Sequence, residues 1–191
     1  MSLQDLKIDW NWSLFLDRDG VVNRRIVDDY VRNWEQFEFL PGTLSAIKEL
    51  SDVFGRIIVV SNQQGVGKGL MSEKDVDALH SRMVSEVESA GGRIDRVLYC
   101  GALEKSGSFN RKPNIGMALQ ARKLFPEIRF RQSVMVGDSL SDMIFGKRAG
   151  MKTVFVSSNL PHIRRGYKTI NYVFSDLQAF ARELTVVSRE S

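Results

Sequence analysis

Cysteine, histidine and long apolar stretches are nearly absent from this chain, and each absence excludes a class of protein. Cys100 is the only cysteine in 191 residues, so neither an internal disulfide nor a cysteine-based zinc cluster can form within the chain. No segment approaches the roughly 18 apolar residues of a membrane-spanning helix, and residues 1–12 lack an apolar signal-peptide run. We therefore expect a soluble, cytoplasmic protein without a membrane partner. His80 lies in a predicted helix and His162 in a loop, and neither is assigned a catalytic role.

Charge of one sign is not in large excess either. Lys and Arg total 27 against 23 Asp and Glu, which gives a net charge of +4. A small positive charge suits an anionic ligand, but no basic stripe interleaved with aromatic residues is present to follow a nucleic-acid backbone. Nucleic acid is therefore not favoured as a partner. The length suffices for one sizeable core, so we expect a single domain over residues 1–191, and a monomer because no exposed apolar helix face stands out.

Short apolar runs, bounded by Gly, Asp, Asn or Ser, alternate with segments of helical periodicity. The runs predict six buried strands, at Ser13–Leu16, Ile57–Val60, Val97–Cys100, Val134–Val136, Thr153–Val156 and Tyr172–Phe174. Continuous apolar strands joined by helices indicate a parallel sheet that is covered on both faces. We predict an α/β fold, a doubly wound, Rossmann-like sheet of about five or six strands. Ligands of such sheets bind beyond the carboxyl ends of the strands, so the residues that follow each strand are the candidates for a site.

Carboxylates follow the first and the fourth strands. Asp17 and Asp19 leave the first strand into a turn at Gly20, and Asp138 leaves the fourth strand in the same way. Carboxylates at one site need a counter-charge. Magnesium, which takes one or two carboxylates together with waters and phosphate oxygens, suits this sparse set better than calcium. The alternative is that Asp17 and Asp19 are ordinary turn residues, since Asp and Gly are common at strand ends.

The second and third strands are followed by groups that suit an oxyanion. Residues 61–69 bring a hydroxyl, amides and glycines together before the next helix, and the backbone N–H groups of such a turn can bind an oxyanion. Their glycine spacing does not match a dinucleotide-binding fingerprint. After the third strand, Pro113 fixes the chain next to Lys112, and Asn114 can cap a helix that begins at Ile115. The alternatives are a flexible glycine turn and a solvated surface lysine.

Asp142 has two interpretations that the sequence leaves open. It falls on the first turn of the helix after the fourth strand, where a carboxylate complements the helix dipole. It can therefore be a simple helix cap, or it can reach Lys112 or a metal-bound water.

Together these segments resemble the haloacid dehalogenase superfamily of phosphohydrolases. The first motif is Leu16–Val21, the second is Ser61, the third is Lys112, and the fourth is the run from Gly137 to Asp142. The match extends over roughly three quarters of the chain, from Ser13 to about Val156. More narrowly, the chain resembles the heptose-bisphosphate phosphatase branch, whose nearest relatives are histidinol-phosphate phosphatases, at Phe15–Gly20 with Asn23, Phe37–Phe39, Ser61–Gly65 and Arg111–Pro113.

The resemblance implies a reaction and roles for these residues. The implied reaction removes the 7-phosphate of a D-glycero-D-manno-heptose 1,7-bisphosphate, on the route to lipopolysaccharide or surface-layer sugars. Asp17 would form an aspartyl-phosphate, and Asp19 would act first as acid and then as base. Magnesium would be held by Asp17, the backbone carbonyl of Asp19 and Asp138. Ser61 and Lys112 would bind the transferring phosphoryl group, and further substrate contacts would come from Asn23, Asn62, Gln63, Gln64 and Arg111.

The sequence departs from this branch in one loop. Relatives usually carry several Cys and a His before the Arg-Lys pair, whereas here Cys100 leads to Arg111 without other ligands, so no zinc is expected. The spacing of the motifs leaves no room for a cap domain, and selectivity is left to loops at Arg24–Trp34, Leu103–Asn110 and Asn159–Lys168. In the last loop Arg164, Arg165 and Lys168 form either a distal phosphate site or a solvated basic cluster.

Three alternative functions remain beside the predicted heptose-bisphosphate phosphatase. Histidinol-phosphate phosphatase is the first, and comparative turnover separates it. A DNA 3'-phosphatase is the second, because such domains share a capless fold and an Asn-Gln turn after the second motif. The third is a non-catalytic phosphate-binding protein, since a fold alone does not prove chemistry.

Overall fold

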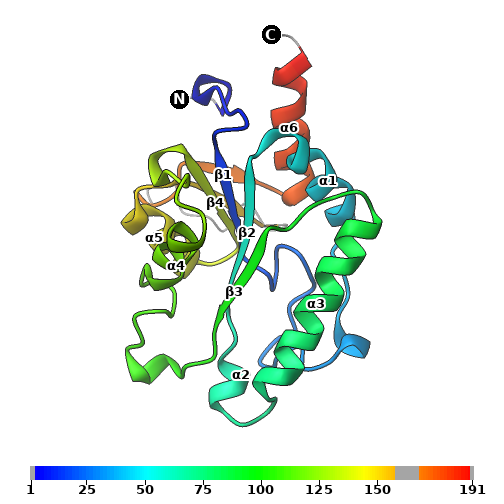
Figure 1. Ribbon diagram of the computed structural model, residues 1–191, viewed down its shortest axis with the longest axis vertical. Helices are drawn as coiled ribbons and strands as arrows, with labels where there is room; N and C mark the ends of the chain where they lie inside the picture. Colours follow the sequence, from blue (N-terminus) through cyan, green and yellow to red (C-terminus); the bar gives the residue numbers. More distant parts are fainter. Residues whose placement is uncertain (1–2, 158–167, 190–191) are drawn as a thin grey trace.

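The sheet contains all six strands that the apolar runs predict, and every pairing in it is parallel (Figure 1). The structure, a computed structural model, describes residues 3–157 and 168–189. The strand order is β3-β2-β1-β4-β5-β6, which is that of a doubly wound Rossmann-like sheet, so the predicted fold class is confirmed. The strands are β1 Ser13–Leu16, β2 Arg56–Asn62, β3 Arg96–Cys100, β4 Ser133–Gly137, β5 Lys152–Val156 and β6 Tyr172–Phe174.

Helices cover both faces of the sheet. In Figure 1, α4 and α5 lie on one face, and α1, α3 and α6 lie on the other. The connection from β1 to β2 holds η2 and α1, and that from β2 to β3 holds α2 and α3, so the described residues contain no inserted cap domain. No helix among residues 3–157 and 168–189 has both the length and the apolarity that a bilayer crossing requires. The α-helices are α1 Thr43–Val53, α2 Gln64–Gly67, α3 Glu73–Ser89, α4 Gly116–Leu124, α5 Leu140–Ala149 and α6 Leu177–Arg189, and the 3-10 turns are η1 Leu3–Leu6, η2 Trp34–Gln36, η3 Glu104–Ser106 and η4 Phe130–Gln132.

Two apolar layers explain why the strands read as continuous apolar runs. Successive side chains of a strand point to opposite faces, so Leu14 and Leu16 of β1 enter the core beneath α1, α3 and α6, whereas Phe15 enters the core beneath α4 and α5. All four residues of β1 are buried. A sheet that is covered on both faces leaves no polar alternation in its central strands.

The strand order reverses between β1 and β4, and this point places the candidate site. Leu16 pairs with Val59 of β2 on one side and with Val136 of β4 on the other. The backbone N–H of Asp17 continues the ladder by donating to Val136 O at 2.9 Å. The residues after β1, β2 and β4 therefore emerge together at the edge where ligands of such sheets bind.

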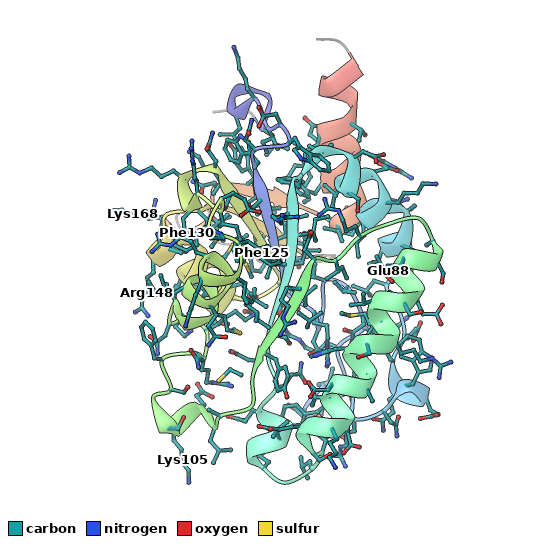
Figure 2. The ribbon with its side chains drawn as sticks, viewed as in Figure 1. Glu88, Lys105, Phe125, Phe130, Arg148 and Lys168 are labelled. Atoms are coloured by element: carbon teal, nitrogen blue, oxygen red, sulfur yellow. The ribbon has the colours of Figure 1, made fainter. Side chains whose placement is uncertain are left out.

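Two expectations outside the sheet have different outcomes. Asn114 does not cap α4, so that prediction is wrong: the N-cap position is Ile115, without a side-chain hydrogen bond, and the Asn114 amide donates instead to Ser108 O at 3.0 Å. The loop carbonyl of Phe109 accepts from the N–H of Gly116, at the start of α4. One N–H group at the start of this helix therefore has an acceptor without a capping side chain. The basic loop lies mostly outside the described residues, as do Arg164, Arg165 and His162, while Lys168 is described and exposed (Figure 2).

Candidate active site

Lys112 forms a buried charge cluster with two of the predicted carboxylates. Its Nζ lies 2.8 Å from Asp17 Oδ1 and 2.6 Å from Asp142 Oδ1, and it also donates to Val60 O at 2.8 Å. Lys112 is 3% exposed, Asp17 6% and Asp142 0%. The lysine is therefore a structural and electrostatic centre of the site, and the surface-charge interpretation is wrong.

The loop that carries Lys112 is fixed to β2 by the side chain of Asn62. The Asn62 Oδ1 accepts from the backbone N–H of Lys112 at 3.0 Å, and its Nδ2 donates to the backbone carbonyl of Lys112 at 3.1 Å. The Lys112–Pro113 peptide bond is cis. The two hydrogen bonds from the Asn62 side chain explain how Lys112, which is far from β1 in the sequence, reaches the end of that strand.

Asp142 combines both of its interpretations. Its Oδ2 accepts from the backbone N–H of Ser139 at 3.1 Å and from the Ser139 hydroxyl at 2.6 Å, which completes a capping box at the start of α5. Its Oδ1 faces Lys112. Gly137 makes room for this carboxylate, because a Cβ there would lie 2.3 Å from the Asp142 Cβ. One residue therefore caps the helix and holds the lysine.

Burial sets the protonation of this cluster. It raises the pKa of Asp17 to about 7, with repulsion from Asp142 adding to the shift and Lys112 opposing it. Burial also raises the pKa of Asp138 to about 6, against the attraction of Arg25. For Lys112, burial alone would lower the pKa, but Asp142 and Asp17 outweigh it and the pKa is raised. If Asp17, Asp138 and Asp142 are all ionised, their negative charge exceeds the single positive charge of Lys112, a condition that favours a further cation.

Three carboxylates lie close together where such a cation could bind. Asp17, Asp138 and Asp142 each have a carboxylate oxygen within 4.8 Å of the others, but both oxygens of Asp142 are already engaged by Lys112 and Ser139. The Nη2 of Arg25 lies 2.7 Å from Asp138 Oδ1, 3.0 Å from the backbone carbonyl of Asp19 and 4.0 Å from Asp17 Oδ2. The guanidinium of Arg25 thus lies where oxygens of Asp17, Asp138 and the Asp19 backbone converge. An all-oxygen set of this kind fits Mg²⁺.

Asp19 turns its side chain away from these oxygens. Its carboxylate accepts from Arg18 Nη2 at 2.9 Å, from Asn23 Nδ2 at 3.0 Å and from Gln63 Nε2 at 2.8 Å. Burial alone would raise its pKa, but Arg18 leads the interactions that outweigh burial, and the pKa is lowered. The pKa values of Asp17 and Asp19, which are two residues apart, are therefore shifted in opposite directions from that of an ordinary aspartate.

Arg18 and His80 form a buried support that the sequence did not suggest. Arg18 is 1% exposed, and its Nη1 lies 3.0 Å from His80 Nε2. A guanidinium can only donate, so this imidazole nitrogen is the acceptor. Burial, followed by the nearby Arg18, lowers the pKa of His80 to about 3. In the sequence Arg18 is a charged residue two positions after a buried strand, and the inward direction of its side chain depends on α3, where His80 lies.

The predicted substrate residues separate into two groups. Ser61, Asn62 and Arg111 line the cleft. Asn23 and Gln63 are buried beside Asp19, and Gln63 also donates to Ser61 Oγ at 2.7 Å. Gln64 joins two loops, because it donates to the Tyr30 hydroxyl and accepts from the N–H of Glu104. These three amides are not among the residues that line the cleft, and they hold the groups that do.

The cleft itself has a volume of about 460 Å³ and opens at the carboxyl edge of the sheet. The loop at 24–34 borders it as predicted, through Arg25, Tyr30 and their neighbours. Lys68, Ser139 and Ser141 also line it and were not predicted. In the loop between β3 and α4, Lys105 is exposed and points outward (Figure 2). The cleft is thus polar, charged and lined from several strand ends.

Comparisons with known proteins agree with this geometry. A HAD-hydrolase-like family model matches residues 109–179. The D-glycero-alpha-D-manno-heptose-1,7-bisphosphate 7-phosphatase of Mycobacterium bovis is 47% identical over 132 residues, which cover 69% of this chain and 70% of that protein. The D-glycero-beta-D-manno-heptose-1,7-bisphosphate 7-phosphatase of Rhodopseudomonas palustris is 39% identical over 144 residues, covering 72% of this chain and 78% of that protein.

A solved structure is similar over nearly the whole chain. The crystal structure of D,D-heptose 1,7-bisphosphate phosphatase from B. bronchiseptica, complexed with magnesium and phosphate, matches with a TM-score of 0.83 and 28% identity, covering 94% of this chain and 99% of that chain. The strand order, the four strand-end motifs and these relatives agree. The chain therefore belongs to the haloacid dehalogenase-like hydrolases, in the family of the heptose-bisphosphate phosphatases.

Proposed function

We propose that this protein is a magnesium-dependent phosphatase that removes the 7-phosphate of D-glycero-D-manno-heptose 1,7-bisphosphate. The observation that carries the proposal is the buried Asp17–Lys112 pair at the reversal of the strand order, next to the convergent oxygens of Asp138 and Asp19. Relatives of both anomeric specificities support the sugar, and the solved relative with magnesium and phosphate supports the metal.

In the proposed reaction, an oxygen of Asp17 attacks phosphorus while the bond between phosphorus and the sugar oxygen breaks, which forms an aspartyl-phosphate. Water then attacks that phosphorus and releases Asp17 and inorganic phosphate. Lys112 and Ser61 bind the phosphoryl oxygens as charge develops on them. Asp17, Asp138 and the Asp19 carbonyl would hold magnesium, which supplies charge neutralisation when an anionic carboxylate meets an anionic phosphate.

Asp19 is proposed to protonate the leaving sugar oxygen and later to accept a proton from water. In this structure it is held as a carboxylate by Arg18, Asn23 and Gln63, and its pKa is lowered. A group in that state carries no proton at neutral pH. The acid step therefore requires Asp19 to leave at least part of this donor set and turn toward the cleft.

Several properties stay predictions. They are the action of residues 1–191 as one monomeric domain, a cytoplasmic location, the small phosphorylated metabolite as partner, and a site without zinc. The single, buried and free cysteine supports a reducing compartment. The preferred anomer at carbon 1 stays open, because relatives carry the alpha name and the beta name.

Phosphate release with magnesium tests the function. The substrates are both anomers of the heptose bisphosphate, histidinol phosphate and a 3'-phosphorylated oligonucleotide, with Asp17→Asn as the inactive control. We expect strong preference for one heptose anomer and no turnover by the variant. Comparable slow turnover of all four substrates would contradict the heptose assignment and leave only the superfamily. Turnover that survives Asp17→Asn would contradict the mechanism.

A further inference from the structure

Arg25 reaches from the loop between β1 and α1 into the place where the metal is proposed to bind. One nitrogen, Nη2, contacts Asp138 Oδ1 at 2.7 Å and the Asp19 backbone carbonyl at 3.0 Å, with Asp17 Oδ2 at 4.0 Å. These three oxygens are the proposed ligands of magnesium. The side chain of Arg25 is 48% exposed and lines the cleft, so it is not locked in place by packing.

A guanidinium and a magnesium ion cannot share these oxygens. Magnesium takes oxygen ligands at about 2.0–2.1 Å in octahedral geometry, whereas Arg25 holds two of the same oxygens at 2.7 and 3.0 Å. Two cations at one position also repel each other. Metal binding therefore requires the Arg25 side chain to move. Residues 26 and 28–31, which follow Arg25 in the chain, line the cleft, so the cleft is the space next to Arg25 into which its side chain can move.

We propose that Arg25 is a specificity residue with two positions. In the first position it lies between the proposed metal ligands, and in the second, with magnesium in that place, it binds the second phosphate of the bisphosphate substrate. This inference rests on the proposed function, because a bisphosphate offers a second anionic group at a distance from the reacting phosphorus.

The charges of the cleft favour the second phosphate as the new partner of Arg25. Two of the acidic side chains near the loop are already paired, since Asp29 contacts Arg32 and Glu38 contacts Arg24, whereas Asp28 lines the cleft. The reacting phosphate is directed to Asp17, so the other phosphate lies further along the cleft, which Lys68 and Arg111 also line. A planar guanidinium with several donors matches a phosphate in charge and in geometry.

The variant Arg25→Gln gives two effects of opposite sign. Magnesium affinity, measured by isothermal titration calorimetry without substrate, is expected to increase about tenfold, because a charge-assisted hydrogen bond that competes with the metal is removed. The ratio of kcat/KM for the heptose 1,7-bisphosphate to kcat/KM for the heptose 7-monophosphate is expected to fall about tenfold. General damage to the site would instead weaken magnesium binding.

Two further variants serve as controls. Arg24→Gln removes the same charge from the adjacent position, where the side chain is 60% exposed and pairs with Glu38 on the surface. It should leave the magnesium affinity and the substrate ratio unchanged. Arg25→Lys keeps the charge without the planar fork, and both of its values should fall between those of the wild type and Arg25→Gln.

Each outcome decides part of the proposal. Magnesium affinity that is unchanged or weaker in Arg25→Gln overturns the first position, and an unchanged bisphosphate-to-monophosphate ratio overturns the second. A failure of the proposed function looks different, because the wild type would then release phosphate from the bisphosphate no faster than from histidinol phosphate or the 3'-phosphorylated oligonucleotide at saturating magnesium. The calorimetric comparison would still report on the first position in that case.

Discussion

The buried cluster of Lys112, Asp17 and Asp142 makes a quantitative prediction about stability. Lys112→Met removes the ammonium that lies 2.8 Å from Asp17 and 2.6 Å from Asp142, and both carboxylates stay buried. Breaking a buried ion pair from one side costs about 3–5 kcal/mol. A domain of this size has a total free energy of unfolding of about 5–15 kcal/mol, so the variant should lose a large part of its stability.

Asp142→Asn should cost less by itself, about 1.5–3 kcal/mol for one charged hydrogen bond, because Lys112 keeps Asp17 as a partner. In the double variant Lys112→Met/Asp142→Asn, the repulsion between the Asp17 and Asp142 carboxylates is absent. The Lys112–Asp142 ion pair, which each single variant loses, is lost only once in the double variant. We expect the double variant to be about 2 kcal/mol more stable than the sum of the two single losses predicts.

Urea unfolding followed by circular dichroism at neutral pH, without magnesium or phosphate, measures this cycle, since a bound ligand would add its own stabilisation. Lys105→Met is the matched control, because Lys105 points outward from an exposed loop (Figure 2) and its loss should change stability by no more than about 0.5 kcal/mol. Losses that add within about 0.5 kcal/mol would refute the coupled cluster.

Three further predictions concern the surroundings of this cluster. His80 has a pKa of about 3 in the folded protein against the ordinary histidine value of 6.5, so between these values the unfolded chain binds more protons and stability falls as the pH falls. His80→Gln should therefore lose about 2 kcal/mol less than the wild type between pH 7.5 and 5 in urea titrations, and equal losses would contradict this. Gly20→Ala should cost roughly 1–3 kcal/mol in thermal unfolding, because φ is +93° and the new Cβ would lie 1.9 Å from Asp138 Oδ2; an unchanged melting temperature would be the contrary result. Asp138→Asn should weaken magnesium binding about tenfold or more in calorimetry while the circular dichroism spectrum is kept, and an unchanged affinity would remove Asp138 from the metal site.

The sheet and the strand-end residues could be predicted from the sequence for a single physical reason. A parallel sheet that is buried on both faces requires apolar strands without polar alternation, and its carboxyl ends lie at one edge. Asp17 and Asp138 follow adjacent strands in the sheet, so their proximity follows from the order of the strands. Lys112 was harder, because its place depends on the paired contacts with Asn62, and no local pattern signals such a contact.

The side chains that support the site could not be predicted because the fold decides their direction. Asn23 and Gln63 are polar residues in loops at the cleft, yet their amides turn inward to Asp19. Arg25 has the sequence context of a solvated arginine. Its partner Asp138 is 113 positions away in the sequence. Asn114 precedes a helix, as a cap would, but the loop carbonyl of Phe109 already meets the first turn of that helix. In each case a tertiary contact overrides a local preference.

Asp17 and Asp19 lie in opposite environments, and the proposed reaction makes a different demand on each. Burial raises the pKa of Asp17, the proposed nucleophile, to about 7, which disfavours its ionised form. Arg18 lowers the pKa of Asp19, so the proposed acid is ionised. The first step requires the reverse of both states. A cation at Asp17 and Asp138 would favour the ionised form of Asp17, whereas the Asp19 carboxylate is held by Arg18, Asn23 and Gln63. The proposed reaction therefore needs two events, the binding of a cation beside Asp17 and the release of the Asp19 carboxylate, and the donors that oppose the second are Arg18, Asn23 and Gln63.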